Sequence, residues 1–103
     1  MKIQKYVAEL IGTFVLASVV AISIISHTPV PTQVIAALTL GLFVYTIGGI
    51  SGAHLNPAVT IAMATVRKIS VKDAVLYVVL QLIGGFLALY FTRYFTGATT
   101  GIE

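Results

Sequence analysis

Hydrophobic residues in this chain form three long runs and one short run, separated by small groups of polar, glycine and proline residues. The long runs cover residues 6–26, 32–50 and 71–94. A helix needs about 20 apolar residues to cross the hydrocarbon core of a bilayer, and each long run meets that length. The pattern therefore predicts three membrane-spanning helices, with a short helix over residues 57–66 between the second and third.

Residues between the runs give signals for where helices start. A turn at residues 27–31 contains Pro29 and Pro31, which exclude one continuous helix through the first two runs. Thr32 is the expected N-cap of the second span. Asn56 favours the N-cap of the short helix, and Pro57 suits the first helical position, where no N–H donor is needed.

The short helix is too short to cross a membrane. At 1.5 Å per residue, a helix from Pro57 to Thr65 is about 13 Å long, against about 30 Å for the hydrocarbon core. One interpretation is a re-entrant half-helix that starts near the membrane midplane, where Asn56 would line a wet cavity. The other is a short buried helix with an ordinary asparagine cap. The spacing alone leaves both open.

Two polar residues lie inside the predicted spans and need partners there. Glu9 is either close enough to the headgroups to stay hydrated, or its carboxylate accepts hydrogen bonds from backbone N–H groups of the irregular stretch 51–55. Gln81 is expected either to form a hydrogen bond between two helices or to face a cavity, because an amide in lipid is left without partners. Both side chains are candidates for supporting the 51–55 stretch.

Composition narrows the class of protein. Hydrophobic residues make up 58% of the chain and charged residues only 9%, which predicts an integral membrane protein. Cysteine is absent, so disulfides, thiolate nucleophiles and cysteine metal sites are excluded. The sequence shows no clustered acid–base pair, nucleophile or metal-ligand set, so neither an enzyme nor a cofactor is expected. The net charge of +3 comes from flanking residues, which suits anionic lipid headgroups and does not resemble a nucleic-acid patch.

Basic residues gather at one end of the predicted bundle: Lys2, Lys5, Arg67, Lys68 and Lys72. Arg93 alone marks the other end. The positive-inside rule then places the N-terminus in the cytoplasm and lets the half-helix enter from the cytoplasmic side, in the inner or plasma membrane of a cell.

Three stretches of the chain match a known family in order. Ala8–Phe14 (AELIGTF) resembles the first-helix signature of the aquaporin and glycerol-facilitator family, and Ser51–Thr60 (SGAHLNPAVT) is similar to the loop carrying its first Asn-Pro-Ala motif. Gln81–Gly85 (QLIGG) looks like its third helix. The resemblance implies an all-α membrane fold of two inverted halves, each with spans and a half-helix. It also implies a channel for water, glycerol or similar small neutral solutes.

The resemblance also implies which residues line a pore. They are Asn56, Pro57 and Ala58, the backbone carbonyls of Gly52, Ala53 and His54, and, in the second span, Ala36. The His54 side chain is either a pore ligand or a structural partner of its loop. Ala36 is small, so the constriction is expected to be wider than in a strict water channel.

The match covers one half of the family's fold. The second half of the family carries Asn-Pro-Ala followed by arginine, whereas Val59 follows Ala58 here. A pore therefore needs another half. It is either an inverted second copy, giving an antiparallel homodimer and, with four pores, eight chains, or a separate second-half chain. The rival interpretation is a non-conducting structural or regulatory subunit that pairs with another channel chain.

Overall fold

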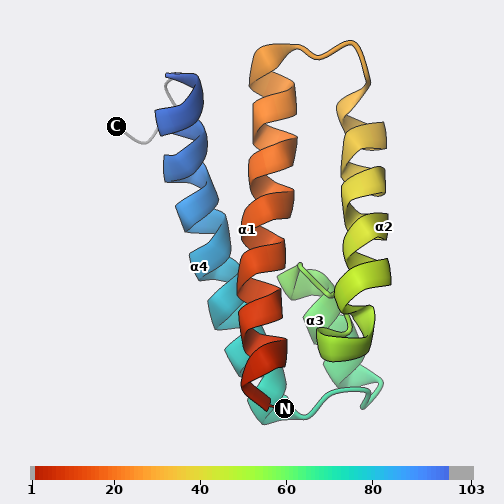
Figure 1. Cartoon of the computed structure of the whole chain (residues 1–103). Helices are drawn as coiled ribbons and strands as arrows, with labels where there is room; N and C mark the ends of the chain where they lie inside the picture. The colour runs from red at the N-terminus through yellow and green to blue at the C-terminus, as the bar shows by residue number, and fades with distance from the viewer. Residues whose placement is uncertain (1, 98–103) are drawn as a thin grey trace.

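The chain folds into four α-helices in a computed structural model that describes residues 2–97. They are α1 (Lys2–Ser26), α2 (Thr32–Ser51), α3 (Pro57–Thr65) and α4 (Val71–Thr96). In Figure 1, α1 stands between α4 and α2, and the short α3 lies beside the lower half of the bundle. The three long helices are each long and apolar enough to cross a membrane.

Helix boundaries differ from the sequence prediction at several ends. α1 begins at Lys2 and α4 continues to Thr96, so the flanking charged residues are helical too. The prediction that Thr32 caps α2 is wrong. Pro31 occupies the N-cap with φ −57° and ψ 140°, and Thr32 is the first helical residue. Its Oγ1 instead accepts a hydrogen bond from Ser23 Oγ of α1 at 2.9 Å, which joins the two helices at their turn.

Burial in this bundle is the reverse of that in a water-soluble protein. The largest fully buried side chains are polar or charged, namely Gln81, Glu9, Thr60 and Thr92. Large apolar side chains such as Leu38 and Phe86 are more than 60% exposed. This arrangement is stable in a bilayer, because lipid covers the apolar surface while polar groups must find partners inside the protein.

The segments predicted to carry the basic residues lie together at one end of the bundle. The N-terminus of α1 and the turn between α3 and α4 lie together at the bottom of Figure 1, opposite the α1–α2 turn. Lys5 Nζ lies 2.6 Å from Asp73 Oδ2, so an ion pair joins α1 to the first turn of α4. Tyr6 donates a second hydrogen bond to the same carboxylate.

Helices α1 and α4 pack closely at Gly84. A Cβ added at Gly84 would lie 2.9 Å from the backbone oxygen of Leu10, whereas one added at Gly85 meets nothing within 4 Å. Small residues at such crossings let membrane helices pack backbone to backbone.

We expect Gly84→Ala to destabilise the fold by about 1–3 kcal/mol, because the backbone must shift, and Gly85→Ala to be neutral. Thermal unfolding of both variants in the same lipid checks this. Equal midpoints would contradict it.

Candidate functional site

The stretch between α2 and α3 is held in an unusual backbone conformation. Gly52 caps α2 with φ 88°, and Ala53 and Leu55 also have positive φ, at 49° and 52°. Gly52 has a second constraint, since a Cβ there would lie 3.0 Å from His54 Nε2. Non-glycine residues with positive φ are rare and persist only where their surroundings hold them. Something must therefore fix Ala53 and Leu55.

The fixing group is Glu9 of α1, which is completely buried. Its carboxylate accepts hydrogen bonds from the backbone N–H groups of His54 at 3.1 Å and Leu55 at 2.9 Å. It also accepts from Ser51 Oγ at 2.7 Å and from Gln81 Nε2 at 2.8 Å. The alternative of a hydrated Glu9 near the headgroups is therefore wrong, because helix α1 carries the side chain into the protein interior.

A second polar cluster lies behind the loop. Thr60 Oγ1 accepts a hydrogen bond from Gln81 Nε2 and lies 2.9 Å from His54 Nδ1. The His54 ring also meets the Tyr77 ring edge-on, with centroids 5.2 Å apart. Gln81 thus bridges α4 to both Glu9 and α3, and the buried His54 side chain is a partner within the loop.

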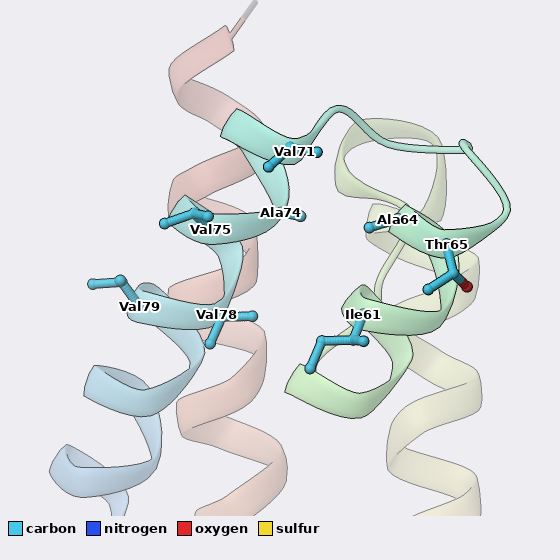
Figure 2. Close-up of a pocket in the computed structure, with 8 residues that line it drawn as sticks. All are labelled: Ile61, Ala64, Thr65, Val71, Ala74, Val75, Val78 and Val79. Atoms are coloured by element: carbon cyan, nitrogen blue, oxygen red, sulfur yellow. The ribbon is translucent and has the colours of Figure 1, made fainter.

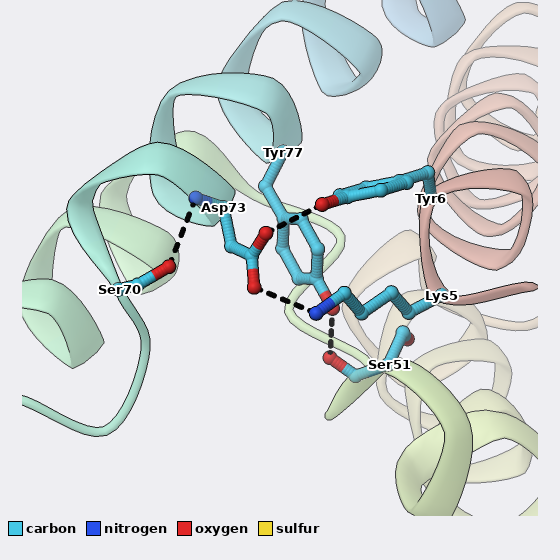
Figure 3. Close-up of polar contacts among 6 residues, drawn as sticks. All are labelled: Lys5, Tyr6, Ser51, Ser70, Asp73 and Tyr77. Carbon is cyan, nitrogen blue, oxygen red and sulfur yellow. Dashed lines mark hydrogen bonds and ion pairs between the residues drawn. The ribbon is translucent and has the colours of Figure 1, made fainter. Parts of the chain in front are cut away.

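Tyr77 ties the end of α2 to α4. Its hydroxyl donates a 2.7 Å hydrogen bond to the carbonyl of Ser51 (Figure 3). The same view shows Lys5 and Tyr6 of α1 converging on Asp73 of α4. The loop is therefore anchored by Glu9 of α1, while from α4 Tyr77 fixes the end of α2 and Gln81 holds Glu9 in place.

The loop N–H groups are bonded by Ser51 and Glu9, whereas its carbonyl groups are not bonded in the described part of the chain. Among the described residues, no donor bonds the carbonyl groups of Gly52, Ala53, His54 or Leu55. Four successive acceptors without partners are expensive away from water. Such a row suits a site where a polar solute or water supplies the missing hydrogen bonds.

Asn56 adds a donor at the start of α3. Its Oδ1 accepts from the backbone N–H of Ala58 at 2.7 Å, as an N-cap does, and Pro57 takes the first helical position. Asn56 is exposed, and no acceptor among the described residues bonds its side-chain NH₂ group. The positive end of the α3 dipole, roughly half an elementary charge, lies at the same helix start.

A model of the family described as major intrinsic protein matches residues 1–102. The chain belongs to the major intrinsic protein family. Members of this family are channels and not enzymes. With its apolar helices, this major intrinsic protein chain is an integral membrane protein and half of an aquaporin-like fold.

Curated relatives support the assignment. Over 97 residues, this family member is 39% identical to the glycerol uptake facilitator protein-like 6 of Lactiplantibacillus plantarum, covering 92% of this chain and 45% of that protein. Nodulin-26 of Glycine max is 40% identical over 93 residues, 84% of this chain and 34% of its own length. Aquaporin NIP1-1 of Arabidopsis thaliana is 37% identical over 84% of this chain and 31% of its own. The chain spans less than half of these relatives, and no solved structure matches it.

The structure groups most of the predicted site residues but not all. Residues 52–58 form one continuous stretch. Glu9 bonds the backbone of this stretch, and Gln81 bonds Glu9. Ala36 is half-buried on α2, in the half nearer the turn at residues 27–31, while the predicted loop follows the other end of that helix. Its place in a pore stays a prediction. Within residues 2–97, no group of three or more His, Cys, Asp or Glu side chains is placed to hold a metal ion.

Sequence reasoning missed two members of the site, Thr60 and Tyr77. Thr60 is a threonine in an apolar helix, and nothing in its neighbours signals that its hydroxyl is fully buried. Tyr77 left a clearer signal, because it lies four residues before Gln81 and therefore on the same face of α4. Both residues are buried, as are Ala74, Gly84 and Ala88 further along that face.

Proposed function

We propose that this chain forms one wall of a membrane channel for water and small uncharged solutes such as glycerol, completed by an inverted second half. The observation that carries the proposal is the pairing of an unsatisfied carbonyl row at residues 52–55 with the free NH₂ group of Asn56. Together they offer acceptors and a donor to a hydroxyl group passing in single file. The names of the relatives support the same function, since they include aquaporins and a glycerol uptake facilitator-like protein.

The second half follows from the polarity of the loop. In a lone copy the free carbonyls and the exposed Asn56 would meet hydrocarbon, where unpaired polar groups cost several kcal/mol each, on the order of 2–7. A second copy inserted upside down supplies the missing wall, with its own half-helix entering from the opposite side. We propose this antiparallel homodimer as the pore unit, and four such pores, or eight chains, as the assembly. A separate second-half chain is the competing partner.

The pore should pass neutral solutes and reject cations. Both α3 helices of the dimer would point their positive ends at the pore centre, which raises the energy of a cation there. The family's filter arginine has no counterpart at Val59, and the small Ala36 is proposed to line the filter from α2. Solutes as wide as glycerol should therefore enter. We place the protein in the cell's inner or plasma membrane with the N-terminus of at least one copy in the cytoplasm.

The direct test is an osmotic step on liposomes. We expect liposomes with the protein to shrink faster than empty liposomes in water flux, and to admit glycerol, because the carbonyl row lowers the cost of dehydration. Circular dichroism on the same samples shows whether the protein is folded. Folded protein with the permeability of empty liposomes would refute the channel and leave the non-conducting subunit as the function.

The Asn56→Asp variant tests the role of Asn56 in the pore without disrupting the fold. Aspartate also caps helices well, so α3 should remain in place. The substitution removes a donor and puts a negative charge beside the proposed pathway. We expect water flux to fall by roughly tenfold, the effect of about 1.4 kcal/mol, and a cation leak to appear. Stopped-flow light scattering and a potassium-sensitive dye measure the two effects. An unchanged flux without leak would show that Asn56 lies off the pathway.

A further inference from the structure

Three basic side chains lie on the turn between α3 and α4 and on the first turn of α4. Arg67, Lys68 and Lys72 are exposed, and none of them forms an ion pair within residues 2–97. The acidic residue beside them, Asp73, is already paired with Lys5 of α1. The turn therefore carries positive charge without compensation, at an end of the bundle where lipid headgroups lie.

Arg67 is held in a conformation that usually belongs to glycine. α3 ends with the hydrogen bonds of a Schellman motif. The Arg67 N–H donates to the carbonyl of Ala64 at 3.1 Å, and the Lys68 N–H donates to the carbonyl of Met63 at 2.8 Å. Arg67 follows the C-cap with φ 60°, at the position where glycine is the usual residue. An arginine in this strained position points to a use for its side chain.

A pocket and a groove meet at this turn. The pocket has a volume of about 550 Å³, and its basic side chains are Arg67 and Lys68. The groove has a volume of about 480 Å³ and runs between α3 and α4 (Figure 2). Ala64, Thr65 and Val71 line both of them, so the pocket leads directly into the groove.

The groove suits an acyl chain. Its lining is apolar except for Thr65, whose hydroxyl donates a 2.6 Å hydrogen bond to the carbonyl of Ala62. With that hydroxyl satisfied, no lining side chain needs a polar partner that lipid lacks. In Figure 2, Val71 lies at the end of the groove beside the turn, and Val79 lies further along α4. An acyl chain that starts at the turn would follow the groove into the membrane.

We propose that the pocket and the groove together bind one phospholipid with an anionic headgroup. Its phosphate lies between Arg67 and Lys68, and one acyl chain lies in the groove. Basic pockets between membrane helices bind anionic headgroups in this way, and the planar guanidinium of arginine matches a phosphate. A soluble anion would fill only the pocket and leave the apolar groove without an occupant.

This inference requires only that the chain lies in a membrane. The carbonyl row at residues 52–55 lines neither the pocket nor the groove. Lipid binding and conduction are therefore separate properties, and each has its own test.

A tryptophan placed in the groove reports on lipid there, because the chain has no tryptophan of its own. Val75 lines the groove and is 57% exposed, so Val75→Trp should fold normally. Brominated acyl chains quench a tryptophan that they touch. In liposomes, we expect brominated phosphatidylglycerol to quench Val75→Trp at a roughly tenfold lower mole fraction than brominated phosphatidylcholine. Val7→Trp on α1 is the control, since Val7 is exposed near the same end but lines neither site, and the two lipids should quench it equally.

Charge variants in the Val75→Trp background test the pocket. Arg67→Gln and Lys68→Gln should each reduce the preference for phosphatidylglycerol by roughly fivefold. Lys72→Gln is the matched control, because it removes the same charge from the same end but Lys72 does not line the pocket. It should leave the preference nearly unchanged. General attraction of anionic lipid to a basic surface would instead be weakened equally by all three variants.

Three results would overturn the proposal. Equal quenching of Val75→Trp by the two lipids would exclude a preference for an anionic headgroup. An equal loss of preference in Arg67→Gln and Lys72→Gln would show that the charge acts at a distance and not in the pocket. A tryptophan that neither lipid quenches would show that protein covers the groove.

Discussion

Replacing Glu9 with alanine should release the loop between α2 and α3 and abolish solute flux. The substitution removes the acceptor of four hydrogen bonds, two of them from the backbone N–H groups of His54 and Leu55. Each buried donor left without a partner costs about 1–3 kcal/mol. Ala53 and Leu55 then lose the contacts that hold their positive φ angles. We expect exchange of the His54 and Leu55 amide hydrogens to accelerate by tenfold or more.

Hydrogen exchange read by mass spectrometry, on liposome samples also used for flux, measures both effects. Gln4→Ala is the matched control, because Gln4 lies on the same helix at an exposed position. Glu9→Gln should be intermediate, since the amide keeps one acceptor oxygen but turns an NH₂ group toward other donors. If the loop amides of Glu9→Ala stayed as protected as those of Gln4→Ala, Glu9 would not be what holds the loop.

Much of the fold could be predicted because the bilayer limits what a chain can do. Runs of about 20 apolar residues have one stable outcome in hydrocarbon, so the spans followed from hydropathy. Pro57 and Asn56 mark the start of α3 by local chemistry, and that prediction is confirmed. The Glu9 contact with the loop could be anticipated for a similar reason. A carboxylate inside a span needs donors, and an irregular loop has free N–H groups.

The rest depends on contacts between residues far apart in sequence. The sequence placed Lys5 and the start of the third span at the same end of the bundle, but it could not show that Lys5 pairs with Asp73, 68 positions away. Thr60 and His54 meet only because the loop turns sharply at Gly52 and Ala53. The position of Thr32 was misjudged because its hydroxyl serves a neighbouring helix rather than its own first turn. Side chains with several possible partners are the ones that local patterns cannot assign.

Packing and charge favour different orientations of the copies in the membrane. An antiparallel homodimer needs some copies inserted each way. The basic residues at one end favour a single orientation, with that end in the cytoplasm. Lys5 is paired with Asp73, which reduces the bias, and no lysine or arginine lies in the turn at residues 27–31 to oppose it. Packing should prevail, because an unsatisfied loop costs several kcal/mol in every misassembled copy, roughly 2–7 per buried group.

Single cysteines can read the orientation directly, since the natural chain has none. Thr28 and Val66 are both exposed and lie near opposite ends of the bundle. We expect a membrane-impermeant maleimide applied to intact cells to label part of the Thr28→Cys population and also part of the Val66→Cys population. Adding Val30→Lys opposes the charge bias and should increase the labelled share of Val66→Cys. If only Thr28→Cys is ever labelled, every copy inserts the same way. The inverted homodimer then cannot form, and the pore must take its second half from a different chain.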